Sequence, residues 1–230
     1  MIGRLKAWAY ERHPDVVRIF QLIRYETLGH AAHIAGRLSP AKRRFLSGLN
    51  GKKGLKLNIA SGGEKREGWI SVDVSLAADI RMDLRKPLPF GDGSASLIFC
   101  EHFCDHLNYP FMIKKFLSQC NRILEPGGRA RFIMHDARDL ARAYLENDTK
   151  YFHDGNMGGL RPSEGVNLLY RFNDFHQFLY DFETFERLLK EAGFSQVIRS
   201  SFLHSEIPGL VLDVNLPDRP ALSMYIEAIK

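Results

Sequence analysis

Three groups of small or acidic residues each follow a short apolar stretch of the chain. A turn of small residues lets the backbone approach a ligand closely. An aspartate can accept hydrogen bonds from both hydroxyls of a ribose, and a second aspartate can accept one from an adenine amino group. Each feature alone is common in turns, but their order along the chain predicts a nucleoside site. The candidate residues are Ala60, Ser61, Gly62, Gly63, Asp73, Val74, Asp83, Leu84, Glu101 and His102.

Histidines near the ends of the later apolar stretches supply candidate general bases. The imidazole pKa lies close to neutrality, so a histidine can take a proton from a reacting hydroxyl. His176 is the first candidate, followed by His135 together with Asp136, and by His106. A neighbouring carboxylate can orient such a base, which is why Asp136 is included.

The pattern Cys100-x-His102-x-Cys104-x-His106 resembles a zinc-binding sequence only superficially. Residues two apart are strung out in a line on a strand and point apart on a helix, so the four cannot converge on one ion. We therefore expect no metal. The chain has three cysteines. This number is small and odd, so the cysteines do not form a disulfide framework, which agrees with a reducing compartment.

Strand-like and helix-like segments alternate after residue 54. This predicts a mostly parallel sheet covered on both faces, with the ligand at the carboxyl ends of its strands. No clear helix separates the last two strands, which indicates an antiparallel edge. The expected strands are 55–60, 69–74, 78–84, 95–100, 129–134, 196–203 and 222–229, and the expected helices are 110–124, 136–147 and 182–194.

The first two strands are separated only by residues 61–68. A helical crossover needs roughly ten to twelve residues, so the first helix is expected to be short or missing. Dinucleotide sites place their pyrophosphate on the N-terminus of that helix. S-adenosylmethionine (SAM) has no phosphate, and the spacing therefore favours SAM over NAD or FAD.

Several segments resemble the class I SAM-dependent methyltransferases, closest to a small bacterial subgroup with Gly-Trp after the first motif. The resemblance covers about residues 55–195 and implies a Rossmann-like fold, SAM as cofactor and methyl transfer. Ala60 stands where the family has a glycine, and Asp105-His106-Leu107 stands for its Glu-His-Leu. The segments are LNIASGGEKREGWISVD, DLRKPLPF, ASLIFC with the following Asp105-His106-Leu107, ILEPGGRARF and HQFLYDFETFERLLKEAGF.

The basic charge is concentrated in residues 1–50, which we expect to form a helical extension of a catalytic domain spanning 51–230. This segment has nine Lys/Arg and three acids, a net +6, so the chain total of +5 leaves about −1 for the rest. Helices are expected over 14–25 and 39–49, the first with an apolar stripe of Val16, Ile19, Phe20 and Ile23. The simplest expectation is that this stripe packs on the catalytic domain; binding to anionic lipid is the alternative. Because every candidate cofactor residue follows Gly54, the segment should be separable from cofactor binding.

Residues 148–176 are rich in glycine and aromatic residues. So long a connection is usually functional or disordered, and the aromatics argue against disorder. We expect an acceptor-side lid that brings His176 toward the transferred methyl group. Arg161, Tyr170 and Arg171 are its candidate substrate-binding residues.

The resembling subgroup is associated with surface-polysaccharide and secondary-product pathways. It implies O-methylation of a small-molecule acceptor, a sugar or glycan intermediate. The residues after the fourth strand lack the Asn-Pro-Pro-Tyr or Pro-Cys elements common in nucleic-acid methyltransferases, which disfavours nucleic acid. Two alternatives remain, a non-catalytic SAM-fold binding protein and an RNA methyltransferase that uses the basic arm. No signal peptide or membrane-spanning run is evident, so we expect a cytoplasmic protein, at most peripheral to the inner membrane face.

Overall fold

The computed structural model describes residues 12–154, 160–172, 175–207, 209–213 and 222–230. Its strands are β1 (Leu55–Ile59), β2 (Ile70–Asp73), β3 (Ile80–Arg81), β4 (Ala95–Glu101), β5 (Leu124–His135), β6 (Gln196–Ser200) and β7 (Ser223–Ile229). Its helices are α2 (Pro14–Leu38), α3 (Pro40–Ser47), α4 (Phe111–Ile123), α5 (Ala137–Leu145), α6 (Thr149–Asp154), α7 (Pro162–Arg171) and α8 (Phe182–Glu191), with a 3₁₀ turn η1 (Cys104–His106). Within these residues, no helix combines the length and apolar character needed to cross a bilayer.

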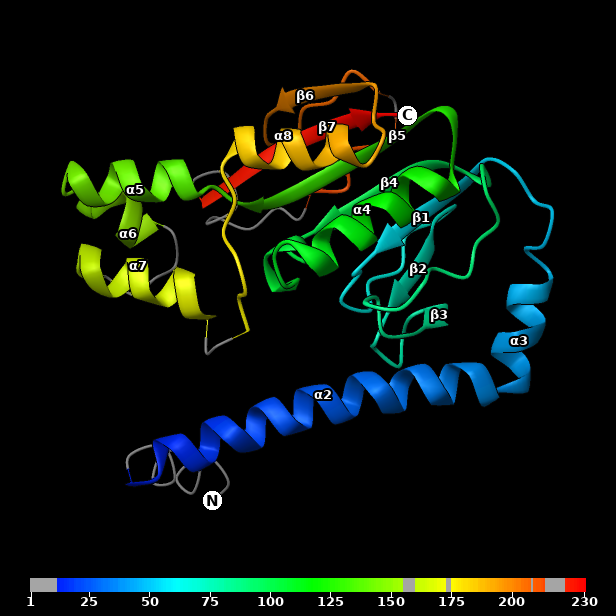
Figure 1. Ribbon diagram of the computed structural model, residues 1–230, viewed down its shortest axis with the longest axis horizontal. Coiled ribbons are helices and arrows are strands. Elements are labelled where there is room, and N and C mark those ends of the chain that lie inside the picture. Colours follow the sequence, from blue (N-terminus) through cyan, green and yellow to red (C-terminus); the bar gives the residue numbers. More distant parts are fainter. Residues whose placement is uncertain (1–11, 155–159, 173–174, 208, 214–221) are drawn as a thin grey trace.

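The strands form one seven-stranded sheet in the order β3-β2-β1-β4-β5-β7-β6 (Figure 1). β1 to β5 pair in parallel, whereas β7 runs antiparallel to both β5 and β6. The predicted α/β fold, with a mostly parallel sheet and an antiparallel pair at one edge, is confirmed. Residues 61–68 contain only turns, so the first helix is missing, as the short spacing predicted.

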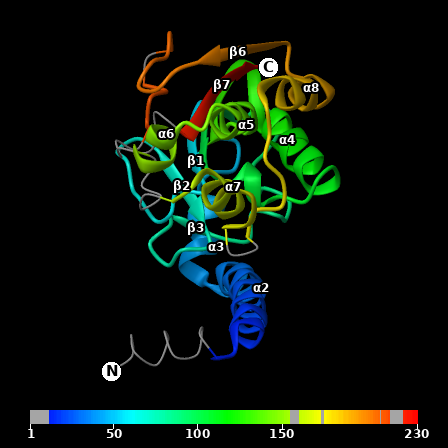
Figure 2. The same cartoon turned by 90° about the vertical axis from the view of Figure 1, so that its left-hand side faces the viewer.

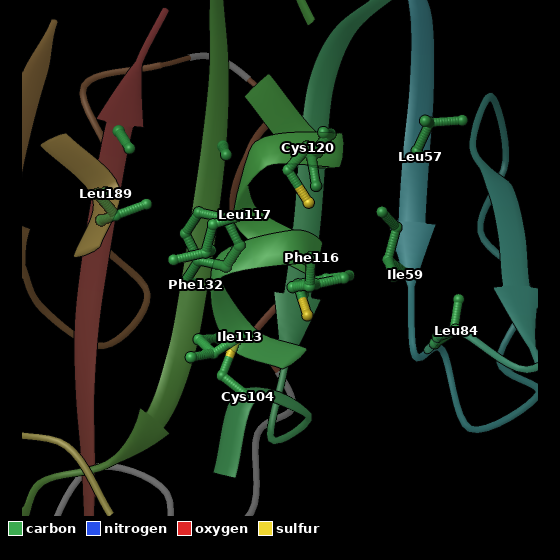
Figure 3. Packing of buried hydrophobic residues seen from close by; sticks show 14 of the residues in the cluster. Leu57, Ile59, Leu84, Cys104, Ile113, Phe116, Leu117, Cys120, Phe132 and Leu189 are labelled. Carbon is green, nitrogen blue, oxygen red and sulfur yellow. The ribbon is translucent and has the colours of Figure 1, made fainter. Parts of the chain in front are cut away.

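One face of the sheet is covered by α4 and α8, which present apolar side chains at helical spacing. Ile113, Phe116, Leu117 and Cys120 of α4 are buried, and Figure 3 shows them packed against Phe132 of β5 and the neighbouring strands. The cysteines Cys100, Cys104 and Cys120 are all free thiols buried in this core. They pack as small apolar side chains.

Helices were expected on both faces of the sheet, but in the described part of the chain the opposite face is not covered by helices. Two stretches without helix, 201–207 and 209–213, pack Phe202 and Leu212 onto the sheet. Arg131 of β5 points to this side and is fully buried. Its guanidinium contacts Asp213 at 2.6 Å and Glu227 at 2.7 Å, so a buried ion network fastens the second of these stretches to the sheet. A helix is missing here because the connection after β1 is too short to form one.

The described part of the segment 148–176 is largely helical, which corrects the expectation of a loop; its role as an acceptor-side lid stays a prediction. α6 and α7 pack with α5 at one end of the molecule (Figures 1 and 2). Tyr151 and Phe152 are buried in a second apolar cluster there, so they stabilise this unit and are not available to stack on an acceptor. Residues 155–159 and 173–174 of the segment lie outside the described residues.

The long helix α2 extends well beyond the predicted 14–25 and lies along the β3 edge of the sheet (Figure 1). Val16, Ile19, Phe20 and Ile23 are 56–67% exposed, so the expectation that this stripe packs on the domain is wrong. The contact is made further along the helix by small residues. A Cβ atom added to Gly36 would lie 2.1 Å from the backbone oxygen of Arg81, so only glycine permits this close approach.

We expect Gly36→Ala to displace α2 from the sheet, although alanine is intrinsically the better helix former by about 1 kcal/mol. Limited trypsin digestion should then cleave the arginine-rich α2–α3 region at least several-fold faster than in the wild type. Gly91→Ala is the matched control, because an added Cβ at Gly91 meets nothing within 4 Å. Equal cleavage of both variants would contradict the packing described for α2.

Candidate functional site

Two adjoining cavities lie at the carboxyl ends of β1, β2 and β4. The first, the Asp73 cavity, has a volume of about 270 Å³, and the second, the Glu101 cavity, about 300 Å³. Ala60, Gly62 and His102 line both cavities, so the two meet at the turn after β1. Nine of the ten candidate cofactor residues line one cavity or the other: Ala60, Ser61, Gly62, Asp73, Val74, Asp83, Leu84, Glu101 and His102.

Gly63, the tenth candidate, is in neither lining and has a structural role instead. Its φ is +93°, and an added Cβ would lie 2.6 Å from the Ser75 hydroxyl. Glycine therefore allows the turn after β1 to pack against the turn after β2. This packing positions the backbone of the cavity wall.

The turn after β1 is held against the end of β2 by the Asp73 carboxylate. Asp73 accepts hydrogen bonds from the amides of Gly62 at 3.1 Å and Ser75 at 2.8 Å. Ala60 and His102 both have positive φ values, +60° and +47°, although a left-handed backbone costs an alanine roughly 1–2 kcal/mol. Such strain in non-glycine residues is concentrated at functional sites, and here both residues line the cavities.

Asp83 lies in the Asp73 cavity but is already held by an arginine. Arg85 binds both Asp83 carboxylate oxygens at 2.9 Å and reaches Glu26 of α2 at 2.6 Å. Burial raises the pKa of Asp83, but these hydrogen bonds outweigh it and hold that pKa below its usual value. Asp83 therefore stays ionised, and its predicted contact with an adenine amino group would have to share the carboxylate with Arg85.

Helix α2 supplies part of the cavity wall, which differs from the expectation that residues 1–50 are separable from cofactor binding. Leu28 and Gly29 line the Asp73 cavity beside Asp83 and Arg85. No motif marks this contact in the sequence, because the cavity residues of α2 are an ordinary leucine and an ordinary glycine 44 positions or more before Asp73. Removal of residues 1–50 would therefore open the cavity.

Four histidine rings gather at the carboxyl edge of β4 and β5, next to the Glu101 cavity. The ring centroids of His102 and His135 are 4.5 Å apart, those of His135 and His176 are 5.3 Å apart, and those of His176 and His106 are 4.9 Å apart. β4 and β5 are parallel neighbours, so the residues that end them meet. The structure thus brings His106, His135 and His176, three separate candidates in the sequence, into one histidine cluster with His102.

The burial of the histidine cluster keeps its inner rings uncharged. Burial lowers the pKa of His176 to about 4 and also lowers that of His106. The Nδ1 atom of His176 hydrogen-bonds to the Leu169 carbonyl of α7. His176 is therefore neutral at pH 7 and donates through Nδ1, which leaves Nε2 as the atom able to accept a proton.

Asp105 is the carboxylate of the histidine cluster, a role that its sequence position did not predict. It is fully buried, and burial raises its pKa to about 8, an effect that the hydrogen bond from the His135 amide only partly opposes. Its backbone oxygen accepts hydrogen bonds from the amides of Gln177 and Phe178. Asp105 thereby ties the His176 segment to the end of β4. The feature of the sequence that could have indicated this role is Asp105-His106-Leu107, which stands where the resembling family has Glu-His-Leu.

Asp136 does not orient His135, which corrects the predicted pair. Its carboxylate caps α5 by accepting from the Arg138 and Asp139 amides, and it binds Arg199 at 2.7 Å. His135 instead contacts the Leu222 carbonyl through Nδ1 at 3.3 Å. The side chain after a strand end points away from its neighbour, so adjacency in sequence did not imply a dyad.

The candidate substrate residues lie on α7. Arg161 precedes the helix, where its amide binds Glu164, and Tyr170 and Arg171 are exposed near its other end. Tyr170 is one residue from Leu169, whose carbonyl holds His176. The side chains of these residues are exposed at α7, the helix whose Leu169 carbonyl binds His176. Their role in acceptor binding stays a prediction.

Comparisons with known proteins agree with this site. Residues 60–132 match a family model described as a methyltransferase domain. A search of curated proteins finds no match. Among solved structures, a SAM-dependent methyltransferase from Archaeoglobus fulgidus is 16% identical, with 82% of this chain and 90% of that chain covered and a TM-score of 0.48.

Two further structures are similar at the same level. One is a SAM-dependent methyltransferase from Thermotoga maritima, 17% identical, with 92% and 96% of the two chains covered and a TM-score of 0.45. The other is a phosphoethanolamine N-methyltransferase from Haemonchus contortus in complex with SAM, 16% identical, with 78% of this chain and 49% of that chain covered and a TM-score of 0.45. At these scores we draw no conclusion about acceptors from any of them.

Residues 60–132 therefore match a methyltransferase domain. The matched residues contain the turn after β1, Asp73, Asp83 and the end of β4, which form much of the walls of the two cavities. SAM, the cofactor predicted from the sequence, fits these cavities. A carboxylate stands at the end of β2 and a turn of small residues approaches closely, with no helix N-terminus to hold a phosphate.

We expect Asp73→Ala to weaken binding of SAM and of S-adenosylhomocysteine by about 1.5–3 kcal/mol, the usual loss for a hydrogen bond to a charged group. Isothermal titration calorimetry measures this directly. Asp79→Ala is a control for loss of a nearby aspartate, since Asp79 binds Ser71 and Lys65 outside both cavities. Wild-type affinity in Asp73→Ala would remove this residue from the cofactor site.

Proposed function

We propose that this methyltransferase methylates a hydroxyl group of a polar small molecule, a sugar or glycan intermediate or a related secondary metabolite. The observation that carries the proposal is the histidine cluster beside the cofactor cavities. A hydroxyl must lose its proton as it is methylated, and a neutral imidazole can take that proton at neutral pH. A protein that only binds SAM has no need of such a group, so the non-catalytic alternative is less favoured.

His176 is the proposed general base, with its ring oriented by the Leu169 carbonyl through Nδ1. Bound SAM would supply a methyl group from a positively charged sulfur, which would keep the electron pair of the broken carbon–sulfur bond. Nε2 of His176 would take the proton that the acceptor hydroxyl loses as its oxygen is methylated. Arg161, Tyr170 and Arg171 are proposed to hold an acceptor that has a ring and an anionic group.

We expect His176→Ala to lower kcat by about 10²-fold or more while leaving SAM affinity unchanged, because His176 is in the lining of neither cavity. Mass spectrometry of hydroxylated acceptors incubated with enzyme and SAM measures the transfer. Tyr170→Ala should instead raise the KM for the acceptor more than it lowers kcat. Normal turnover by His176→Ala would move the base to another member of the histidine cluster.

We also propose that the N-terminal half of α2 associates with an anionic lipid surface. Its stripe of Val16, Ile19, Phe20 and Ile23 is exposed, and residues 1–50 have a net charge of +6. An apolar face with a basic surplus is typical of helices that lie in a membrane interface. The protein would then meet an acceptor that is itself held at the membrane.

We expect the protein to sediment with vesicles that contain phosphatidylglycerol, and less with vesicles of phosphatidylcholine alone. Phe20→Asp combined with Ile23→Asp should abolish this binding, because the charges cannot enter the acyl region. Leu145→Asp is the control, since Leu145 is even more exposed, at 82%, but lies on α5. Binding that survives the α2 change, or that disappears with the control, would contradict the proposal.

A further inference from the structure

Two histidines and one carboxylate of the histidine cluster have the spacing of metal ligands. His102, Asp105 and His135 each offer one ligand atom, and these atoms all lie within 4.8 Å of one another. Two atoms bound to one ion at about 2.1 Å are at most about 4.2 Å apart. The three ligand atoms are therefore slightly further apart than one ion allows, and the two rings must rotate toward a common centre to bind it.

The outer nitrogen of each ring already has the contact that metal-bound histidines make. The Nε2 atom of His102 lies 3.1 Å from the Ser223 hydroxyl, and Nδ1 of His135 lies 3.3 Å from the Leu222 carbonyl. The carbonyl can only accept, so Nδ1 of His135 is the donor and its lone pair is at Nε2. Donation from His102 to Ser223 likewise places its lone pair at Nδ1. A hydrogen bond that fixes the tautomer and the ring orientation in this way is the usual second contact of a ligating histidine.

Asp105 is a buried carboxylate with an oxygen available to bind a metal ion. It is fully buried, and its Oδ1 atom has no hydrogen-bond partner among the described residues. Its Oδ2 atom lies 3.9 Å from Nδ1 of His102. A buried carboxylate is costly unless it is paired with a cation or coordinates one. In the described part of the chain, no lysine or arginine forms an ion pair with Asp105, so a cation between it and the rings would satisfy it.

We infer that His102, Asp105 and His135 form a binding site for one divalent transition-metal ion. Two imidazoles and one carboxylate suit zinc, iron(II) and similar ions and leave coordination positions open. This set differs from the Cys/His pattern considered in the sequence, because its members come from the ends of two adjacent strands rather than from one run. His102 also lines both cavities, which places the ion beside the cofactor.

The position suggests what the ion would do, and this part rests on the proposed function. An acceptor hydroxyl bound at an open coordination position becomes more acidic, as water does on zinc. Its proton can then pass to His176, whose ring centroid is 5.3 Å from that of His135. The binding of the ion itself does not depend on any methyl transfer.

The test is calorimetric titration of Zn²⁺ into the full-length protein, stripped with chelator and without SAM or acceptor. We expect one Zn²⁺ per chain. Asp105→Asn and His135→Ala should each weaken binding about 100-fold or more, and Ser223→Ala about 10-fold, the usual effect of losing a second contact. His204→Ala is the matched control, because His204 is exposed and belongs neither to the metal-ligand group nor to the lining of either cavity, and it should leave the affinity unchanged. Co²⁺ loading should give a visible absorption band that Ser223→Ala shifts.

Absence of stoichiometric Zn²⁺ binding by the wild type would overturn the inference, as would wild-type affinity in folded Asp105→Asn or in Ser223→Ala. Circular dichroism and S-adenosylhomocysteine affinity establish that each variant is folded. If Asp105→Asn does not fold, Ser223→Ala decides the outcome by itself. Zinc binding without methylation of any hydroxylated acceptor would contradict the proposed function only. Methylation that persists in chelator, with no zinc binding, would contradict the metal site only.

Discussion

The short connection between β1 and β2 is the constraint on which most of this structure depends. Residues 61–68 are too few for a helical crossover, so the chain must reverse through the left-handed turn at Ala60 and Gly62. Asp73 then closes the turn by accepting the Gly62 amide. The same shortage leaves one face of the sheet without its helix. That face is covered by 201–207 and 209–213, which Arg131 holds through two buried ion pairs.

The open edge beside β3 is filled by a helix from outside the catalytic domain predicted from sequence. α2 approaches so closely at Gly36 that no side chain fits between it and the Arg81 backbone. This contact carries Leu28 and Gly29 to the cofactor cavity, and Glu26 to Arg85. One half of α2 therefore lines the Asp73 cavity, and the other half is an exposed apolar surface. Residues that line this cavity and residues proposed to meet a membrane thus lie on one helix.

The chemistry on the acceptor side is concentrated around one buried carboxylate. Asp105 lies among histidines whose charged forms are disfavoured by burial, as the lowered pKa of His176 shows. Neutral imidazoles can accept protons or bind metal ions, whereas imidazolium rings can do neither. Burial of the histidine cluster therefore keeps it in the chemically useful form. α7 holds His176 through Leu169 and packs with α5 and α6, so these helices support the site.

The sequence by itself determined the strands, the missing first helix and nine residues that line the cofactor cavities. These features depend on local quantities: the alternation of apolar segments, the length of one connection, and the residues that end strands. Only the tertiary structure decided that Asp105 lies beside His102 and His135, that Asp136 caps α5, and that α2 packs through Gly36 rather than through its apolar stripe. The Asp105–His135 and Gly36–Arg81 contacts and the Asp136–Arg199 ion pair each join residues 30 or more positions apart. Periodicity predicts the face of a helix or strand on which a residue lies, but it does not predict which other element packs against that face.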